Sequence, residues 1–305
     1  MNSQKHYAAA VSAFVIWGFF SIPLRNLQQY SAGEILYYRI LVSLAILAVV
    51  IVLFRRKSLR ADLVKLQSIS LRAQLTVLGL TLAGGLLLTV NWLTFIYIVN
   101  NINIKTASFS YLICPVITAV LGYLLIAERM TKLQWIAVAL CTISCALIGI
   151  NSALELGYSF LTALTYALYL ISQRKNQGFD RMIVLGIQVA FSLSILSIAS
   201  RYLINEVPQE PSFYWTILLI AAVFTVLPLF LNLFALNRIN SATIGILMYI
   251  NPIFNFTIAF LVFNESITLI QLVGYLIIFA ALIIFNYPFI RQLSMQFPGR
   301  SEAGN

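Results

Sequence analysis

The chain has 305 residues, of which 61% are apolar and 9% charged, and its formal net charge is +10. In soluble domains about 25% of residues are charged, so this chain has too few charges to cover a water-exposed surface. The composition argues against a soluble enzyme, a nucleic-acid-binding protein and a disordered chain. It favours an integral membrane protein.

Ten stretches are long and apolar enough to cross a bilayer as helices, which takes about 20 residues each. In chain order the predicted spans are residues 7–25, 34–54, 73–98, 106–127, 132–150, 157–173, 182–203, 213–236, 241–263 and 268–290. The longest connection, 55–72, is predicted as a loop, and no soluble domain is expected. The first span has no clear small-residue cleavage site, so we expect it to be retained rather than removed as a secretory signal.

The positive charges are distributed unevenly about these spans. If the N-terminus is cytoplasmic, 15 of the 19 Lys and Arg residues fall on the cytoplasmic side and four on the other. Lys and Arg in short loops mark the cytoplasmic side of a membrane protein. We therefore expect both termini in the cytoplasm.

The chain contains an internal repeat, because residues 100–134 align with 237–271 without a gap, at an offset of 137. The matched polar residues and prolines are Asn100/Asn237, Asn103/Asn240, Thr106/Thr243, Pro115/Pro252, Glu128/Glu265, Thr131/Thr268 and Gln134/Gln271. A weaker register, with an offset of 149, aligns Trp17 and Arg25 with Tyr166 and Arg174.

The repeat unit comprises five spans, and an odd number of spans inverts the second copy in the membrane. Inverted repeats are typical of transporters, because they allow two similar states that open to opposite sides. The sequence thus predicts an all-α protein of ten transmembrane helices in two inverted five-helix repeats. We place these at residues 1–152 and 153–290, followed by a cytoplasmic tail at 291–305.

Three glutamates near span ends are candidate gates or proton sites. Glu128 and Glu265 directly precede the sequences Thr131-x-x-Gln134 and Thr268-x-x-Gln271, both of which have the spacing of a helix capping box. Glu34 lies beside the first outer loop. The alternative for the hairpin glutamates is that they are interfacial turn residues, since a charge near water costs little.

Two prolines fall in the middle of predicted spans four and nine, at Pro115 and Pro252. A proline removes a backbone hydrogen bond and bends its helix. Freed carbonyls at membrane depth need protein or a watery cavity around them. Matched prolines therefore suggest a central cavity. Asn251 and Asn255 share one face of span nine, where they either line this cavity or form hydrogen bonds between helices.

Several polar or amphipathic residues lie within spans, where they are costly unless they face protein or a cavity. Arg39 either snorkels to the surface or lies toward the outer mouth and attracts an anionic group. Tryptophan is often only an interfacial anchor, but Trp17 and Trp92 lie inside their spans. The predicted substrate-contacting residues near mid-membrane are Trp17, Asn91, Trp92, Asn251 and Asn255, with Arg39 toward the outer mouth.

The sequence offers little for catalysis or metal binding. Its one histidine is His6, and no acidic residue lies in the middle of a span. Cys114, Cys141 and Cys145 are better explained as small buried thiols than as metal ligands. There is no phosphate-binding G-x-x-x-x-G-K-[ST] motif. We expect no catalytic residue, metal or cofactor.

Five segments of the chain resemble the RarD proteins, of the EamA branch of the drug/metabolite transporter superfamily. They are FVIWGFFSIPLRNL, GEILYYRILVS, NWLTFIYIVNN, ASFSYLICPV and AERMTKLQWIAV. The resemblance covers most of the chain and implies a ten-helix carrier of the bacterial inner membrane with a central substrate cavity. Cys114 departs from the Asn expected before Pro115, whereas the second half keeps Asn251, which argues against a symmetric role for this pair.

These observations favour a secondary transporter in the lipid bilayer, an exporter of a small metabolite, an amino-acid-like compound or a drug. One alternative is a pore or a regulatory partner without a transport cycle. A membrane-embedded enzyme acting on lipid is less well supported, because it needs inward-facing acid–base or metal-binding residues. The sequence leaves open whether the chain forms a homodimer.

The charge distribution gives a testable topology. Fusions to a reporter that is active only in the periplasm should be silent at residue 305 and active near residue 155, because the positive charges keep both termini inside. Reporter activity at the C-terminus would contradict the predicted number of spans.

Overall fold

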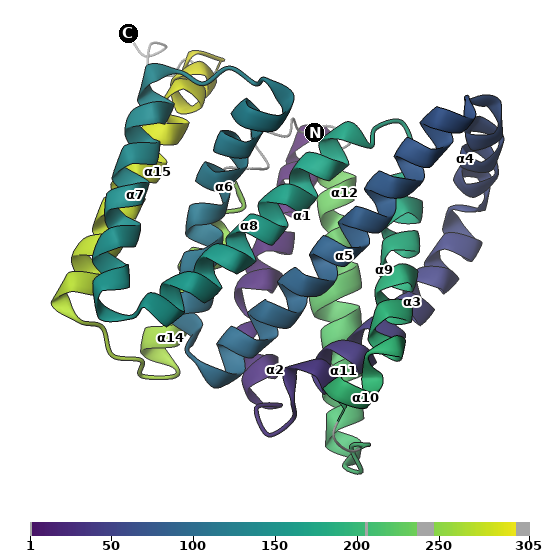
Figure 1. The fold of residues 1–305 in the computed structure, drawn as a ribbon, viewed down its shortest axis with the longest axis horizontal. Helices are drawn as coiled ribbons and strands as arrows, with labels where there is room; N and C mark the ends of the chain where they lie inside the picture. Colours follow the sequence, from purple (N-terminus) through teal and green to yellow (C-terminus); the bar gives the residue numbers. More distant parts are fainter. Residues whose placement is uncertain (1, 205–206, 237–246, 297–305) are drawn as a thin grey trace, which may run out of the picture.

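The computed structural model describes residues 2–204, 207–236 and 247–296. These residues form a bundle of helices (Figure 1), and no strand occurs among them. Nine helical segments are long and apolar enough to cross a membrane, and Ile250–Leu261 is a shorter apolar helix. The all-α membrane fold is therefore confirmed, although the start of predicted span 241–263 lies outside the described residues.

Helices of the first half account for the first five spans. They are α1 (Asn2–Gly18), α2 (Ser21–Arg25), α3 (Ala32–Phe54), α4 (Arg56–Ser68), α5 (Leu71–Asn101), α6 (Ile104–Ile126) and α7 (Lys132–Asn151). The first span is divided into α1 and α2, because the ring of Pro23 would clash with the carbonyl of Phe19 in a continuous helix.

The prediction of a loop at 55–72 was wrong, because most of this connection folds as α4. Its residues combine good helix formers, such as Leu, Lys and Arg, with an amphipathic pattern. None of its residues is buried. The helix lies at the edge of the bundle (Figure 1). Because the sequence indicates no segment that would pack against its apolar face, it offers no reason to expect a helix there.

Helices of the second half follow the same order as those of the first. They are α8 (Ala153–Lys175), α9 (Arg181–Ile198), α10 (Ser200–Leu203), α11 (Pro211–Ala221), the π-helix η1 (Ala222–Val226), α12 (Leu227–Leu236), α14 (Ile250–Leu261) and α15 (Leu269–Gln296). A π-helical turn widens the helix and is frequent at functional sites. In η1 the Thr225 hydroxyl donates to the Ile220 carbonyl at 3.0 Å.

Both predicted capping boxes are present. The Thr131 N–H donates to Gln134 Oε1 at 2.8 Å, and the Gln134 N–H donates to Thr131 Oγ1 at 3.3 Å. The same two bonds join Thr268 and Gln271, both at 3.2 Å. Each box satisfies backbone donors that have no partner within the helix, which fixes the starts of α7 and α15.

The hairpins before these boxes also have the same backbone. Ala127 and Asn264, which are 137 residues apart, have positive φ angles of 53° and 50°. The Glu128 N–H donates to the Gly122 carbonyl at 3.1 Å, and the Glu265 N–H donates to the Ala259 carbonyl at 2.9 Å. This left-handed helix ending is a common way to satisfy the last carbonyls of a helix. The register found in the sequence therefore extends to backbone geometry.

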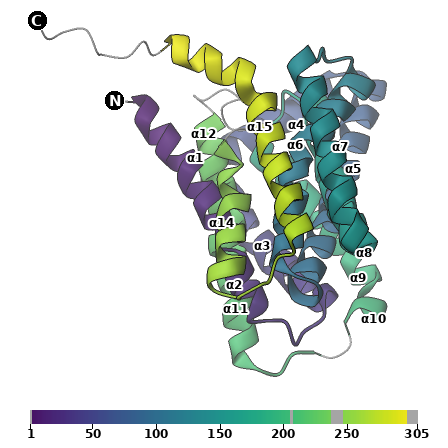
Figure 2. The same cartoon turned by 90° about the vertical axis from the view of Figure 1, so that its left-hand side faces the viewer.

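Contacts between the two halves occur in symmetric sets. The packing of α8 against α5 and α6 is matched by the packing of α1 against α12 and α14, and α5 against α9 is matched by α11 against α3. Three further contacts each join two corresponding helices of the repeats, so the symmetry maps each contact onto itself. They are α7 with α15, α3 with α9, and α6 with α14. Figure 2 shows α1 beside α12 and α14. These are the contacts expected for inverted repeats related by a pseudo-two-fold axis.

A close approach between α1 and α14 gives a stability prediction. A Cβ atom at Gly18 would lie 2.5 Å from Phe254 Cβ, whereas one at Gly79 would have no neighbour within 4 Å. Gly18→Ala should therefore lower the free energy of unfolding by about 1–3 kcal/mol, the usual cost of overpacking. Gly79→Ala, the control in helix α5, should raise it by up to about 1 kcal/mol through helix propensity.

Thermal unfolding in detergent measures both changes. A melting temperature for Gly18→Ala equal to that of the wild type would show that α1 and α14 are not in close contact.

Candidate functional site

Arg39 lies at the centre of a cluster formed by four segments of the chain. Its guanidinium carbon is 4.8 Å from the ring centre of Phe20 and 5.1 Å from that of Trp92. Its Nε donates to Thr225 Oγ1 at 3.0 Å. Arg39 is 3% exposed, so its charged end does not reach the protein surface. This burial argues against snorkelling, and the structure brings Arg39 and Trp92 together.

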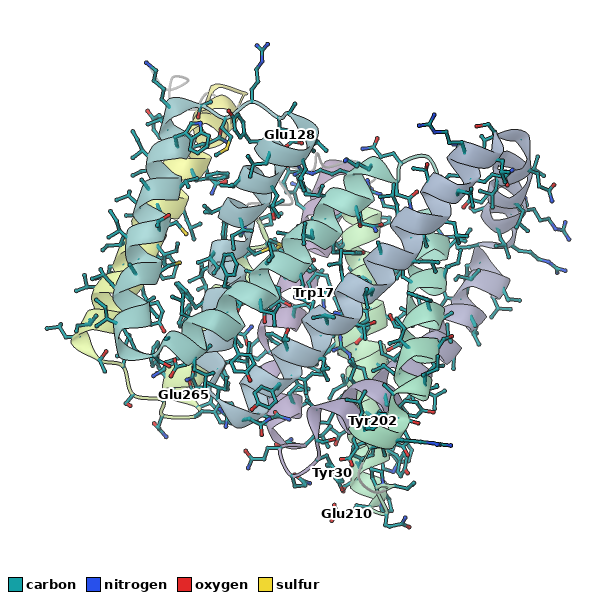
Figure 3. All side chains as sticks on the ribbon, viewed as in Figure 1. Trp17, Tyr30, Glu128, Tyr202, Glu210 and Glu265 are labelled. Carbon is teal, nitrogen blue, oxygen red and sulfur yellow. The ribbon has the colours of Figure 1, made fainter. Side chains whose placement is uncertain are left out.

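Trp17 joins the same cluster through the second half of the chain. Its indole Nε1 donates to the Phe224 carbonyl, within η1, at 3.1 Å. The Phe224 ring stacks on Phe20, with the ring centres 5.7 Å apart. In Figure 3, Trp17 lies between the level of Glu128 and that of Glu265. Trp17, Arg39 and Trp92 thus form one group, linked by Phe20 and Phe224.

Asn91 is engaged in packing between helices. Its Nδ2 donates to the Thr162 carbonyl in α8 at 2.8 Å, and its Oδ1 accepts from the Tyr111 hydroxyl at 3.4 Å. The Tyr111 ring contacts Phe95, which stacks on Phe20. Asn91 therefore lies next to the Arg39 cluster, with aromatic rings between them.

Asn251 and Asn255 form their own pair in α14. Asn255 Nδ2 donates to Asn251 Oδ1 at 2.6 Å, and Asn255 Oδ1 is buried without a partner among the described residues. No described hydrogen bond joins this pair to Arg39. A Cβ on Gly18 would lie 3.5 Å from the backbone carbonyl oxygen of Asn251, so the backbone of α14 at Asn251 lies close to the end of α1.

The two matched prolines differ in their local backbone. Pro115 lies inside the continuous helix α6, as predicted. Pro252 lies in the first turn of α14, which begins at Ile250, rather than in the middle of a helix. A proline is tolerated in the first turn because its missing N–H would have no partner there.

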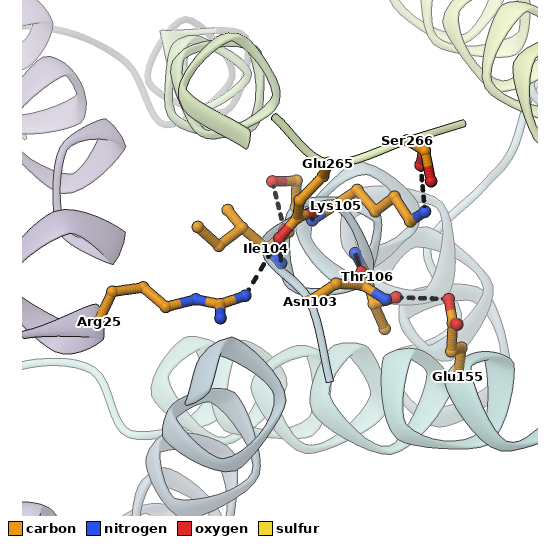
Figure 4. A network of polar contacts seen from close by, with 9 residues as sticks. Arg25, Asn103, Ile104, Lys105, Thr106, Glu155, Glu265 and Ser266 are labelled. Atoms are coloured by element: carbon orange, nitrogen blue, oxygen red, sulfur yellow. Dashed lines mark hydrogen bonds and ion pairs between the residues drawn. The ribbon is translucent and has the colours of Figure 1, made fainter. Parts of the chain in front are cut away.

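Glu265 links the two halves at one end of the bundle (Figure 4). Its carboxylate accepts from the backbone N–H groups of Ile104 at 2.7 Å and Lys105 at 3.0 Å, and from the Arg25 guanidinium at 3.1 Å. Ile104 and Lys105 are the first residues of α6. A carboxylate is stabilised at a helix N-terminus, where backbone donors are free and the helix dipole is positive.

Glu128 pairs with the other half at the opposite end of the bundle (Figure 3). Both of its oxygens accept from Arg174 Nη1, at 2.7 and 2.8 Å. Arg174 follows Arg25 by 149 residues, and Glu265 follows Glu128 by 137. The two ion pairs are therefore equivalents, and each joins a cation of one half to a carboxylate of the other.

These equivalent ion pairs differ in exposure. The Arg25 and Glu265 side chains are 20% and 11% exposed, whereas Arg174 and Glu128 are 45% and 44% exposed. The interface between the halves is therefore more tightly closed at the Glu265 end.

Glu34 is part of a helix cap. Its carboxylate accepts from the Ser31 N–H at 2.9 Å, and its own N–H donates to the Ser31 hydroxyl at 3.1 Å. This capping box begins α3.

Sequence reasoning missed Glu155, Phe20 and Thr225. Glu155 accepts from the Thr106 hydroxyl at 2.8 Å, which links α8 to α6 near Glu265 (Figure 4). Its signal was Ser152-x-x-Glu155, which has the spacing of the two capping boxes. Phe20 had no sequence signal beyond its place near Pro23. Thr225 was a single hydroxyl in an apolar run.

No described group of three His, Cys, Asp or Glu side chains could hold a metal ion. Cys114 and Cys141 are buried free thiols. The site that the described residues do form is an aromatic and cationic cluster between the halves, with an ion pair at each end.

Known proteins with similar sequences are transporters. The EamA-like transporter family matches residues 4–150 and again 154–287. An uncharacterized transporter of Vibrio cholerae is 30% identical over 289 residues, covering 93% of both chains. The protein RarD of Escherichia coli is 28% identical over 291 residues, which cover 93% of this chain and 94% of the relative.

A solved crystal structure supports the fold at lower sequence similarity. It has a TM-score of 0.61 and 11% identity, and the match covers 93% of this chain and 98% of the other. At that identity the likeness concerns the fold alone. The two family matches and the relatives identify the chain as a multi-pass membrane transporter, not an enzyme. The chain belongs to the EamA-like transporter family and is related to the RarD proteins.

Proposed function

We propose that this protein is a secondary carrier that exports a small metabolite, an amino-acid-like compound or a drug by alternating access. The main support is the equivalence of the ion pairs Arg25–Glu265 and Arg174–Glu128, which hold the two halves together at opposite ends. An alternating-access carrier needs one closure on each side of its substrate site. Export as the direction is inferred from the exporters of the superfamily that the sequence resembles.

The two ion pairs act as gates that open in turn. Each pair crosses the interface between the halves, so a rocking motion that separates the halves at one end breaks only the pair at that end. The Glu265 carboxylate also accepts hydrogen bonds from the first N–H groups of α6. When that end opens, these N–H groups lose the carboxylate and bind water instead. Rocking of one repeat against the other is a common transport motion in inverted-repeat carriers.

The substrate binds between these gates, in contact with Trp17, Arg39 and Trp92. Asn91, Asn251 and Asn255 complete the predicted site. They are weaker candidates for substrate contact, because their described hydrogen bonds are made to neighbouring protein groups. Aromatic faces with a few convergent polar groups are typical of small-molecule sites.

The protein functions in the bacterial inner membrane with both termini in the cytoplasm. The end that carries Glu128 and the N-terminus (Figures 1 and 3) is then cytoplasmic, and the Glu265 end faces outward. This assignment rests on the 15-to-4 distribution of Lys and Arg. The repeats are residues 1–152 and 153–290, with a cytoplasmic tail at 291–305.

Labelling of Cys114 from each side tests the gates. Cys114 is fully buried in α6, and Cys141→Ser with Cys145→Ser leaves it as the only thiol. Arg25→Gln should increase labelling by a membrane-impermeant maleimide from the outer face, and Arg174→Gln from the inner face. For Arg174→Gln we expect an increase of about 1.4–5-fold, because exposed ion pairs are worth about 0.2–1 kcal/mol. For Arg25→Gln we expect a larger increase, because its ion pair is less exposed.

Arg72→Gln, which removes an exposed cation at the start of α5, is the matched control and should leave labelling unchanged. Increased labelling from the same face in both gate variants would contradict two separate gates. In proteoliposomes, exchange of labelled phenylalanine or benzoate that saturates and shows counterflow supports a carrier, whereas flux that rises linearly with concentration indicates a pore.

A further inference from the structure

The guanidinium of Arg39 has more hydrogen-bond donors than the described residues satisfy. A guanidinium carries five N–H donors. The Nε donor binds Thr225, but Nη1 is buried and has no partner among the described residues. No described carboxylate oxygen lies within 4.0 Å of it. The positive charge is therefore buried without a described counter-ion.

The neighbouring rings compensate this charge only in part. The faces of Phe20 and Trp92 attract the cation, but they do not replace an oxygen acceptor. A charge removed from water is costly unless it is paired and hydrogen-bonded. This arrangement suits a site that receives an anionic group during the functional cycle.

Two irregular backbone segments, one from each half, meet at Arg39. Phe20 lies in the break between α1 and α2, and Thr225 lies in the π-helix η1. Irregular backbone at membrane depth occurs where it is buried in protein or lines a watery path. Movement of one half against the other would therefore change the surroundings of the guanidinium directly.

We propose that Arg39 binds the anionic group of the transported molecule, and that the substrate is a small organic monoanion with an apolar or aromatic body. This proposal rests on the transport function proposed above. One guanidinium matches one carboxylate, which it can bind through two parallel hydrogen bonds. The rings of Phe20, Trp92, Phe95 and Phe224 provide apolar surroundings for the rest of the molecule.

Binding of three small probes of similar shape tests the charge requirement. Purified full-length protein in detergent is titrated with benzoate, with neutral benzamide and with cationic benzylammonium, and melting temperature and tryptophan fluorescence are recorded. Benzoate should stabilise the wild type and change its fluorescence, because Trp92 lies beside Arg39. Benzamide and benzylammonium should have neither effect.

Variants of Arg39 locate the site. Arg39→Met should weaken benzoate binding about 10–100-fold, the effect of losing a charged hydrogen-bond partner. Arg39→Lys, which keeps the charge but not the fork of donors, should bind with intermediate affinity. Arg201→Met removes an exposed cation in α10 and is the control, with unchanged binding expected.

The outcomes separate this proposal from the transport function. The anion site is overturned if benzoate and benzamide stabilise the wild type equally, or if benzoate does not stabilise it at all. Unchanged benzoate binding in Arg39→Met would also overturn it. The wild-type comparison decides the question even where a variant does not fold. Arg39-dependent binding without benzoate flux in proteoliposomes would instead refute transport of this class and leave the anion site standing.

Discussion

The guanidinium charge of Arg39, held away from water within an apolar bundle, is the constraint on which the centre of this structure depends. A buried cation needs ring faces, hydroxyl oxygens or an anion near it. Phe20, Trp92 and Thr225 supply the first two kinds of partner, and they come from both halves of the chain. The position of Arg39 therefore depends on how the repeats are packed against each other.

Irregular backbone makes this arrangement possible. Pro23 interrupts the first span, and Phe20, which lies at the break between α1 and α2, places its ring against the guanidinium. On the other half, the extra residue in the π-helical turn directs the Thr225 hydroxyl toward Arg39 and the Phe224 carbonyl toward Trp17. Both departures from regular helix thus serve the same cluster, and each would be costly if it faced lipid.

Local sequence signals predicted the helices and their caps but few of the contacts at the site. Hydropathy gave the spans because each is a continuous apolar run, and Thr131 predicted its cap because the bond to Gln134 spans three residues. The bond between Arg39 and Thr225 spans 186 residues, which no local pattern reveals. Arg25 belongs to the repeat alignment with an offset of 149 and Glu265 to the alignment with an offset of 137. Neither alignment indicates that the two residues pair, and only the folded structure shows it.

In the proposed alternating-access cycle, the symmetry of the ends would give the two states similar free energies. An ion pair is worth more where water is excluded, since screening is weaker there. In this structure the Arg25–Glu265 pair is the less exposed one. In the inverted state the Arg174–Glu128 pair would take its place. The Arg–Glu pairing lost at the end that opens would then be regained at the end that closes, whereas the backbone bonds from Ile104 and Lys105 to Glu265 have no described counterpart at Glu128. The remaining difference between the states then depends on the centre of the bundle, where Arg39 lies.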